Sequence, residues 1–245
     1  MFKTIISKVK EDAQLIWYRQ EKNCLLCGQL SPEVICSNCQ EDYFQPGIRR
    51  CELCGKLLGP NRIYCYDCQS GKGPRGLKKV TSLGHYEGAW KDFIQKVKFK
   101  GQPYLLIPLA EYFASCAIEH LPPPDSIVPV PMHPNRLAQR GFNQAEVLAS
   151  IISRKLGISY QEVLVRTIDT VPQTTLGRKE RIRNLQSVFT IKPGTMADSQ
   201  IIWLVDDVVT TGTTLGECAE TLHRSGVQEV YGLCLGAGKE KEPGF

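Results

Sequence analysis

The sequence contains no apolar run that reaches the roughly 18–20 residues needed to span a bilayer. Its first 23 residues place apolar side chains at helical spacing among charged ones. They lack the unbroken apolar core and the small-residue cleavage site of a secretory signal. The net charge is only +5, which permits an anionic ligand or nucleic acid but requires neither. We therefore expect a cytoplasmic protein without a membrane span, in which residues 1–23 form an amphipathic lead-in helix.

Disulfides are not expected either, although the chain has 11 cysteines. Most of them form four C-x-x-C pairs near the N-terminus, and in a reducing compartment such pairs bind metals before they form disulfides. Four thiolates complete a tetrahedral site and leave no position for water, so the spacing predicts two structural zinc ions. The predicted ligands are Cys24, Cys27, Cys36, Cys39, Cys51, Cys54, Cys65 and Cys68. Each ion binds either two consecutive C-x-x-C pairs or two alternating pairs in a cross-braced arrangement. The short loop between the first two pairs favours the consecutive arrangement.

The cysteine pairs define the first of two predicted domains, a double zinc ribbon over residues 24–70. This segment has too little apolar content for its own core, so metal would hold it together. A polar, glycine-rich stretch follows and predicts a linker over residues 71–79. Residues 80–240 form the second domain, in which Cys116, Cys218 and Cys234 are expected to fill the core.

Strand and helix patterns alternate through the second domain. Strands are predicted over residues 80–86, 126–130, 163–165, 188–191, 201–205 and 229–235. Helices are predicted over residues 90–99, 104–120, 142–156 and 213–225. This alternation indicates an α/β fold with a mostly parallel sheet flanked by helices on both faces.

The run IIWLVDDVVTTGTTL, residues 201–215, carries the strongest functional signal. Asp206 and Asp207 follow a continuous apolar strand, at the position where open α/β sheets bind their ligands. The next loop consists of Thr210, Thr211, Gly212, Thr213 and Thr214. Hydroxyls and unpaired amides at a helix start suit a phosphate, whereas neighbouring carboxylates suit vicinal hydroxyls. Together they predict a ligand of the ribose 5-phosphate kind.

Basic residues cluster in two further segments. Arg136 and Arg140 follow the strand predicted at 126–130, with His133 and Asn143 nearby. Planar guanidinium donors suit a pyrophosphate, although these arginines could also be solvated in a proline-stiffened loop. Residues 166–184 are also basic and predict either a mobile lid, a nucleic-acid contact or a solvated loop.

Residues 201–215 resemble the 5-phosphoribosyl-1-pyrophosphate (PRPP) motif of type I phosphoribosyltransferases. The whole chain resembles the competence-protein-F (ComF/GntX-type) family. The resemblance rests on the four C-x-x-C pairs, here called knuckles, and on four further blocks. These blocks are KVKFKG at 96–101, VPVPMHPNRLAQRGFNQ at 128–144, PQTTLGRKERIRN at 172–184 and LVDDVVTTGTT at 204–214. Trp203 departs from the smaller aliphatic residues that are usual in this strand.

The resemblance implies a type I phosphoribosyltransferase-like domain that binds PRPP with Mg²⁺. Asp206 and Asp207 would hold the ribose, and Arg136 and Arg140 the pyrophosphate. The remaining PRPP contacts would be Val208, Val209, Thr210, Thr211, Gly212, Thr213 and Thr214. Residues 166–184 would form a flexible catalytic loop, with Gln173, Arg178 and Arg181 facing inward.

The resemblance also implies a role in DNA uptake during natural transformation, with competence-machinery proteins and single-stranded DNA as partners. One hypothesis is an active phosphoribosyltransferase, although no stretch marks an acceptor pocket. Another is a nucleic-acid-handling protein, in which basic side chains track a strand. Those side chains would be Lys91, Lys96, Lys98 and Lys100. A third is a protein adaptor with a vestigial pocket.

Overall fold

The structure is a computed structural model. It describes residues 23–44, 49–59, 61–99, 101–168, 188–195 and 199–240. The lead-in helix predicted over 1–23 therefore falls outside the described residues, apart from its last position. None of the described helices is both long enough and apolar enough to cross a membrane.

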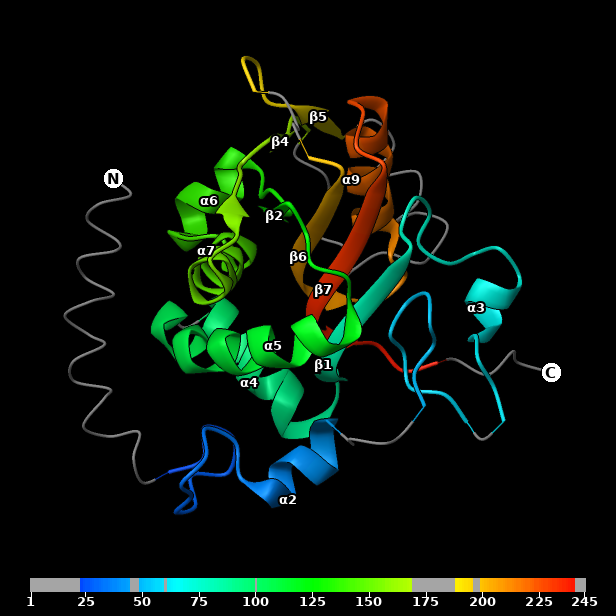
Figure 1. The fold of residues 1–245 in the computed structure, drawn as a ribbon. Helices are drawn as coiled ribbons and strands as arrows, with labels where there is room; N and C mark the ends of the chain where they lie inside the picture. Colours follow the sequence, from blue (N-terminus) through cyan, green and yellow to red (C-terminus); the bar gives the residue numbers. More distant parts are fainter. Residues whose placement is uncertain are drawn as a thin grey trace.

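A five-stranded parallel sheet forms the centre of the molecule, with strand order β1-β7-β6-β2-β3 (Figure 1). Its strands are β1 (Lys79–His85), β2 (Ser126–Pro129), β3 (Ser159–Tyr160), β6 (Ile201–Val209) and β7 (Glu229–Ala237). A separate antiparallel pair consists of β4 (Leu164–Arg166) and β5 (Phe189–Ile191). The longer helices are α4 (Gly88–Phe99), α5 (Leu106–His120), α6 (Pro134–Arg140), α7 (Gln144–Leu156) and α9 (Thr213–Arg224). Shorter helical segments are α2 (Ser37–Cys39), η1 (Gln40–Phe44), α3 (Tyr66–Gln69) and η2 (Pro103–Leu105).

Helices cover both faces of this sheet, because successive side chains of a strand point to opposite sides. In β6, Trp203 and Val205 pack with α4, α5 and α7, whereas Ile202 and Leu204 pack with α9. Figure 1 shows the two helical layers on either side of the sheet. The indole of Trp203 is fully buried, and its Nε1 donates to Pro122 O at 2.9 Å. The predicted α/β fold is confirmed.

Strand β6 is longer than predicted. We expected it to end at Val205, but its pairing with β7 continues to Val209, which lies opposite Ala237. Its pairing with β2 does stop at Val205, opposite Pro129. The acidic pair therefore lies within β6, where one neighbouring strand has already ended and that side of the backbone is open.

The residues of helix α6, which include Arg136 and Arg140, were predicted to form a loop. The structure forms a short helix there, with Pro134 in its first turn and Gly141 at its end, where φ is +83°. Proline at the start and glycine just past the end are the usual helix boundary signals, so the sequence did contain the information. The two-residue strand β3 was also missed, because so short an element has no periodicity.

Both cysteine-rich segments pack on the α/β core. Phe44 meets Trp90 of α4 edge-to-face, with ring centroids 5.0 Å apart. Farther along, Leu53 O accepts a hydrogen bond from Val80 N of β1 at 2.9 Å. Arg50, between the two segments, donates to Phe44 O and to Ser82 Oγ. These contacts join the cysteine-rich segments to β1 and α4.

Candidate functional site

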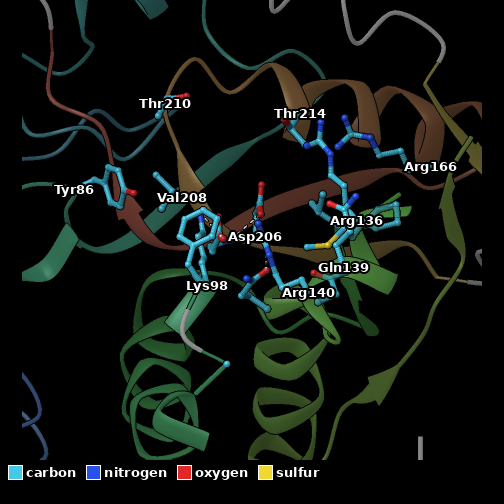
Figure 2. Close-up of a pocket in the computed structure, with 18 residues that line it drawn as sticks. Tyr86, Lys98, Arg136, Gln139, Arg140, Arg166, Asp206, Val208, Thr210 and Thr214 are labelled. Atoms are coloured by element: carbon cyan, nitrogen blue, oxygen red, sulfur yellow. Dashed lines mark hydrogen bonds and ion pairs between the residues drawn. The ribbon is translucent and has the colours of Figure 1, made fainter. Parts of the chain in front are cut away.

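A cavity of about 740 Å³ opens at the carboxyl ends of β2 and β6 (Figure 2). In the sheet, β3 lies on one side of β2 and β6 lies on the other. After β2, the chain therefore first forms β3 on one side of β2 and later forms β6 on the other side, so the strand order changes direction at β2. Open α/β sheets bind ligands in the crevice at such a switch point. The volume is also in the range of small-ligand sites.

Asp207 on β6 forms an ion pair across this cavity with Lys98 at the end of α4. The distance from Lys98 Nζ to Asp207 Oδ2 is 2.7 Å, and the two side chains are only 18% and 16% exposed. Burial by itself would lower the pKa of Lys98, but the charge of Asp207 and its hydrogen bond raise the pKa above its ordinary value. Lys98 therefore stays cationic. It faces the cavity and pairs with Asp207, whereas the sequence analysis had grouped it with the lysines that would track a nucleic-acid strand.

Asp206 has a different electrostatic environment from its neighbour. Burial, followed by the negative charge of Asp207, raises the pKa of Asp206 to about 7. Its Oδ1 accepts a hydrogen bond from Asp207 N at 2.8 Å. The carboxyl group of Asp206 therefore changes charge near neutral pH, and a bound cation would favour its ionised form.

Positive charge dominates the rest of the cavity lining. Arg136, Arg140 and Arg166 face the space together with Lys98, against the two acids of β6. Burial lowers the pKa of Arg140, but a guanidinium titrates so far above neutrality that it remains charged. Its Nη1 donates to Gln144 Oε1 at 3.1 Å. Four cations against two carboxylates favour a ligand with several negative charges.

The 210–214 loop closes one end of the cavity and leads into α9. Gly212 adopts φ +75° at the start of that helix, a conformation that side-chain-bearing residues rarely adopt. The hydroxyls of Thr211 and Thr213 lie 2.8 Å apart within the turn. Thr210 and Thr214 line the cavity. A helix N-terminus beside an open space favours an anion there.

Most of the predicted ligand contacts line this one cavity. They are Arg136, Arg140, Asp206, Asp207, Val208, Thr210 and Thr214. Val209 is instead 2% exposed and packs in the core. Thr211, Gly212 and Thr213 shape the turn. Gln173, Arg178 and Arg181 lie outside the described residues, so their inward orientation stays a prediction.

Two residues named as neighbours of the arginines act as helix caps. His133 Nδ1 accepts from Asn135 N at 3.2 Å at the start of α6. Asn143 Oδ1 accepts from Ala145 N at 3.0 Å and caps α7, and asparagine is among the residue types favoured at this position. Both caps help to fix the helices that carry or follow Arg136 and Arg140.

Sequence reasoning missed five polar contributors to the lining, which are Tyr86, Lys98, Gln139, Gln144 and Arg166. Lys98 follows Ile94 by four residues, so it lies at the border of the apolar face of its helix. That spacing was a usable signal. Arg166 directly follows the strand predicted at 163–165, and this position at a strand end was a second usable signal. Gln144 is 3% exposed, and its Nε2 is buried without a hydrogen-bond partner among the residues that the structure describes, although nothing in the sequence marked it.

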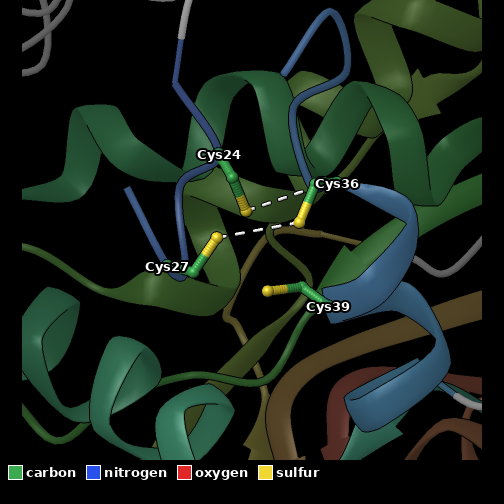
Figure 3. A group of neighbouring side chains, drawn as sticks. All are labelled: Cys24, Cys27, Cys36 and Cys39. Carbon is green, nitrogen blue, oxygen red and sulfur yellow. Dashed lines mark hydrogen bonds between the residues drawn. The ribbon is translucent and has the colours of Figure 1, made fainter. Parts of the chain in front are cut away.

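The eight N-terminal cysteines form two clusters of four. The first cluster is Cys24, Cys27, Cys36 and Cys39, and the second cluster is Cys51, Cys54, Cys65 and Cys68. Within each cluster all sulfur atoms lie within 4.8 Å of one another, so each could hold one metal ion. The pairing is sequential, which excludes the cross-braced alternative. Figure 3 shows the first cluster, with its four side chains turned toward a common centre.

Backbone amides around both clusters favour thiolates. In the first cluster, Leu26 N and Cys36 N both donate to Cys24 Sγ at 3.4 Å. Burial would raise the pKa of Cys24, but backbone hydrogen bonds lower it to about 7. In the second cluster, hydrogen bonds from neighbouring thiols lower the pKa of Cys51 well below its ordinary value. Burial raises the pKa of Cys39, and neighbouring thiols raise the pKa values of Cys54 and Cys68. Metal binding requires the deprotonated form, so a bound cation would have to lower these three pKa values.

The fold and site thus define an α/β protein with an anion-binding cavity at a switch point and two cysteine clusters. Competence protein F of Haemophilus influenzae is 32% identical over 222 residues, 86% of this chain and 95% of that protein. The DNA utilization protein YhgH of Escherichia coli K12 is 30% identical over 221 residues, with the same coverages. Competence protein ComFC of Streptococcus pneumoniae is 29% identical over 234 residues, 86% of this chain and 98% of that protein. The chain belongs to the competence protein F family.

No family model matches the chain. Among solved structures, a glutamine PRPP amidotransferase from B. subtilis is 17% identical, with a TM-score of 0.37 over 54% of this chain and 26% of that one. A purine phosphoribosyltransferase from Pyrococcus horikoshii is 19% identical, with a TM-score of 0.31 over 57% of this chain and 91% of that one. Because both TM-scores are low, the architecture described above rests on the strand order itself.

Proposed function

We propose that the cavity binds PRPP or a closely related phosphoribosyl ligand. Asp206 and Asp207 would accept hydrogen bonds from the ribose hydroxyls, and the 210–214 loop would hold the 5-phosphate. Arg136 and Arg140 would contact the pyrophosphate. The observation that carries the proposal is the position of two carboxylates between a cationic wall and a helix N-terminus in one cavity.

Magnesium fits the donor set of this cavity. Mg²⁺ prefers carboxylate and phosphate oxygens, and it binds through one or two carboxylates together with substrate phosphates. Asp206 and Asp207 would hold the ion, with Lys98 as the competing cation at Asp207. When bound, the ion would supply positive charge between the acids and the pyrophosphate.

Zinc is the proposed metal of both cysteine clusters. A tetrahedral Zn²⁺ with Zn–S bonds of about 2.3 Å places its sulfur ligands ~3.8 Å apart. Cys27 Sγ and Cys36 Sγ lie 3.7 Å apart, and Cys54 Sγ and Cys65 Sγ lie 3.5 Å apart. All four positions are filled by thiols in each cluster, which is typical of structural sites. Metal analysis of the purified chain should give two zinc ions, and clearly fewer would contradict this assignment.

Ligand binding is tested by Asp206→Asn combined with Asp207→Asn. Calorimetry with PRPP and Mg²⁺ should show affinity reduced by about a hundredfold or more, because each lost charge-assisted hydrogen bond contributes about 1.5–3 kcal/mol. Asp92→Asn, an exposed acid on α4, is the matched control and should bind as the unmodified chain does. Unchanged affinity in the double variant would contradict the ribose assignment.

The names of the relatives support a role in DNA uptake and use. We propose that the chain acts in this process through its phosphoribosyl-binding cavity. Expression of the chain in Haemophilus influenzae that lacks competence protein F should restore transformation. The double aspartate variant should not restore it, and restoration by that variant would separate the cavity from the cellular role.

A second candidate is an active phosphoribosyltransferase. A smaller cavity of about 140 Å³ adjoins the main one and shares Pro131, Met132 and Arg166 with it. We propose this cavity as the position of an acceptor. An acceptor would displace pyrophosphate at ribose C1, and Arg136 and Arg140 would stabilise the leaving group. Pyrophosphate release from PRPP that depends on an added nucleobase or amine would support this candidate. Binding without release would favour a sensing or handling role.

A further inference from the structure

The segment that follows the second cluster runs from a cysteine ligand directly to the 210–214 loop. At Gly73, an added Cβ would lie only 2.7 Å from Cys68 Sγ, so the backbone packs closely against that sulfur. The next residue, Pro74, is buried. Its ring packs against Gly212, where an added Cβ would lie 2.6 Å from Pro74 Cβ. Two adjacent residues therefore connect a cluster sulfur with the turn of the loop.

The contact continues along the first turns of α9. Gly216 lies against the backbone of Arg75, where an added Cβ would be 3.1 Å from Arg75 N. Farther on, His223 Nε2 lies 2.7 Å from Gly76 O. Residues 73–76 therefore follow α9 from its N-terminus, although their composition had predicted a flexible linker.

A second segment reaches the start of the same loop. Gly238, just beyond β7, donates from its backbone N to Val209 O at 2.8 Å and packs on Thr210. Two residues later, Glu240 accepts from Tyr66 N at 2.6 Å and from Arg62 Nη1 at 2.9 Å. Tyr66 lies between Cys65 and Cys68 of the second cluster. The loop is therefore flanked by two segments, each attached to that cluster.

We propose that the second cluster, through residues 73–76 and Glu240, holds the 210–214 loop in the shape that receives the ligand phosphate. The cluster thereby acts as a positioning element for the cavity and is not only a stabiliser of its own segment. The inference rests on the proposed phosphoribosyl binding. Its physical basis is preorganisation, because a loop that is already ordered loses less conformational entropy on binding.

The two clusters differ in this respect. The first cluster packs with α4 and α5, where Phe44 meets Trp90 and Gln40 Oε1 accepts from Tyr112 Oη at 3.1 Å. Helix α4 is also held by the core itself, since Trp90 is fully buried and its Nε1 donates to Leu235 O. The positioning role is therefore specific to the second cluster.

The test compares Gly73→Ala with Gly59→Ala in the full chain. The first variant forces Cβ against Cys68 Sγ. The second lies in the same segment, and no atom of the described part of the chain lies within 4 Å of a Cβ added there. We expect Gly73→Ala to bind PRPP with Mg²⁺ about tenfold more weakly and to exchange the amide hydrogens of residues 210–214 about tenfold faster. Gly59→Ala should match the unmodified chain in both measurements, and β6 amides should stay protected in both variants.

The two readouts separate the inference from the proposed function. If the unmodified chain does not bind PRPP, the proposed function fails and amide exchange alone decides the inference. Unchanged exchange and unchanged affinity in Gly73→Ala would overturn it. If the Gly73→Ala variant loses metal, a second variant, Glu240→Gln, is tested in its place. Lys239→Gln is the control for this second variant. Faster loop exchange in Glu240→Gln then supports the inference, and unchanged exchange overturns it.

Discussion

The two cysteine clusters begin with the same C-x-x-C-G knuckle, but they lie in different surroundings. The first includes an exposed ligand, Cys27, and packs on helices that the core already holds. Three ligands of the second are buried, and the neighbouring segments pack on the loop that lines the cavity. A shared local motif therefore does not imply a shared role, because the role depends on what the motif packs against.

The largest difference between the clusters should appear when one ligand is removed from each. Cys27→Ser and Cys54→Ser occupy equivalent positions in their knuckles, and each variant should retain about one zinc ion in place of two. Only Cys54→Ser should also lower PRPP affinity, by about tenfold or more, because the loop loses its ordered neighbours. Metal analysis and calorimetry check both expectations. Equal affinity losses in the two variants would remove the distinction between the clusters.

The packing of the first cluster's segment on α4 can be removed without changing any of its cysteine ligands. Phe44→Ala removes a buried ring from its contact with Trp90 and should lower the free energy of unfolding by about 3–5 kcal/mol. PRPP affinity should be retained in the folded protein, since α4 keeps its own core contacts. Denaturant unfolding measures the first effect and calorimetry the second. Leu30→Ala, at a residue 79% exposed, is the control, and a clear loss of affinity in Phe44→Ala would contradict the comparison.

The ion pair on the acidic side of the cavity should contribute to stability independently of both cysteine clusters. Lys98→Met leaves Asp207 without its ion-pair partner and should lower the free energy of unfolding by about 1–3 kcal/mol. Lys96→Met, on the exposed face of the same helix, should change stability by less than about 0.5 kcal/mol. Denaturant unfolding of both variants at pH 8 distinguishes them. Equal effects would mean that the Lys98 ion pair has no net stabilising role.

The pH dependence of stability should reflect the buried acid Asp206. The pKa of Asp206 rises from 3.8 to about 7 on folding, so the folded state binds more protons than the unfolded state between those values. Stability from this group therefore falls as pH rises from about 4 to about 7. Asp206→Asn does not ionise and should raise the melting temperature by a few degrees more at pH 8 than at pH 5. An equal gain at both pH values would contradict the raised pKa.

The sequence predicted those parts of the site whose residues are adjacent in the chain. The knuckles gave the cluster ligands, and the apolar run before Asp206 placed both acids at the ligand-binding edge of the sheet. Lys98 was predicted only as one of the basic side chains that would track a nucleic-acid strand. Its pairing with Asp207 depends on how α4 lies across that edge, which no local pattern records. The length of β6 was likewise set by a partner strand, β7.

The amino-acid sequence was enough to predict the α/β alternation, the two sets of cysteine ligands and the acidic pair beside a threonine-rich turn. These depend on spacing within one segment, and local backbone geometry follows from that spacing. Long-range packing placed Pro74 against Gly212 and Lys98 against Asp207. Such contacts join segments more than a hundred residues apart, and they arise from the packing of whole elements, which no short stretch of sequence encodes.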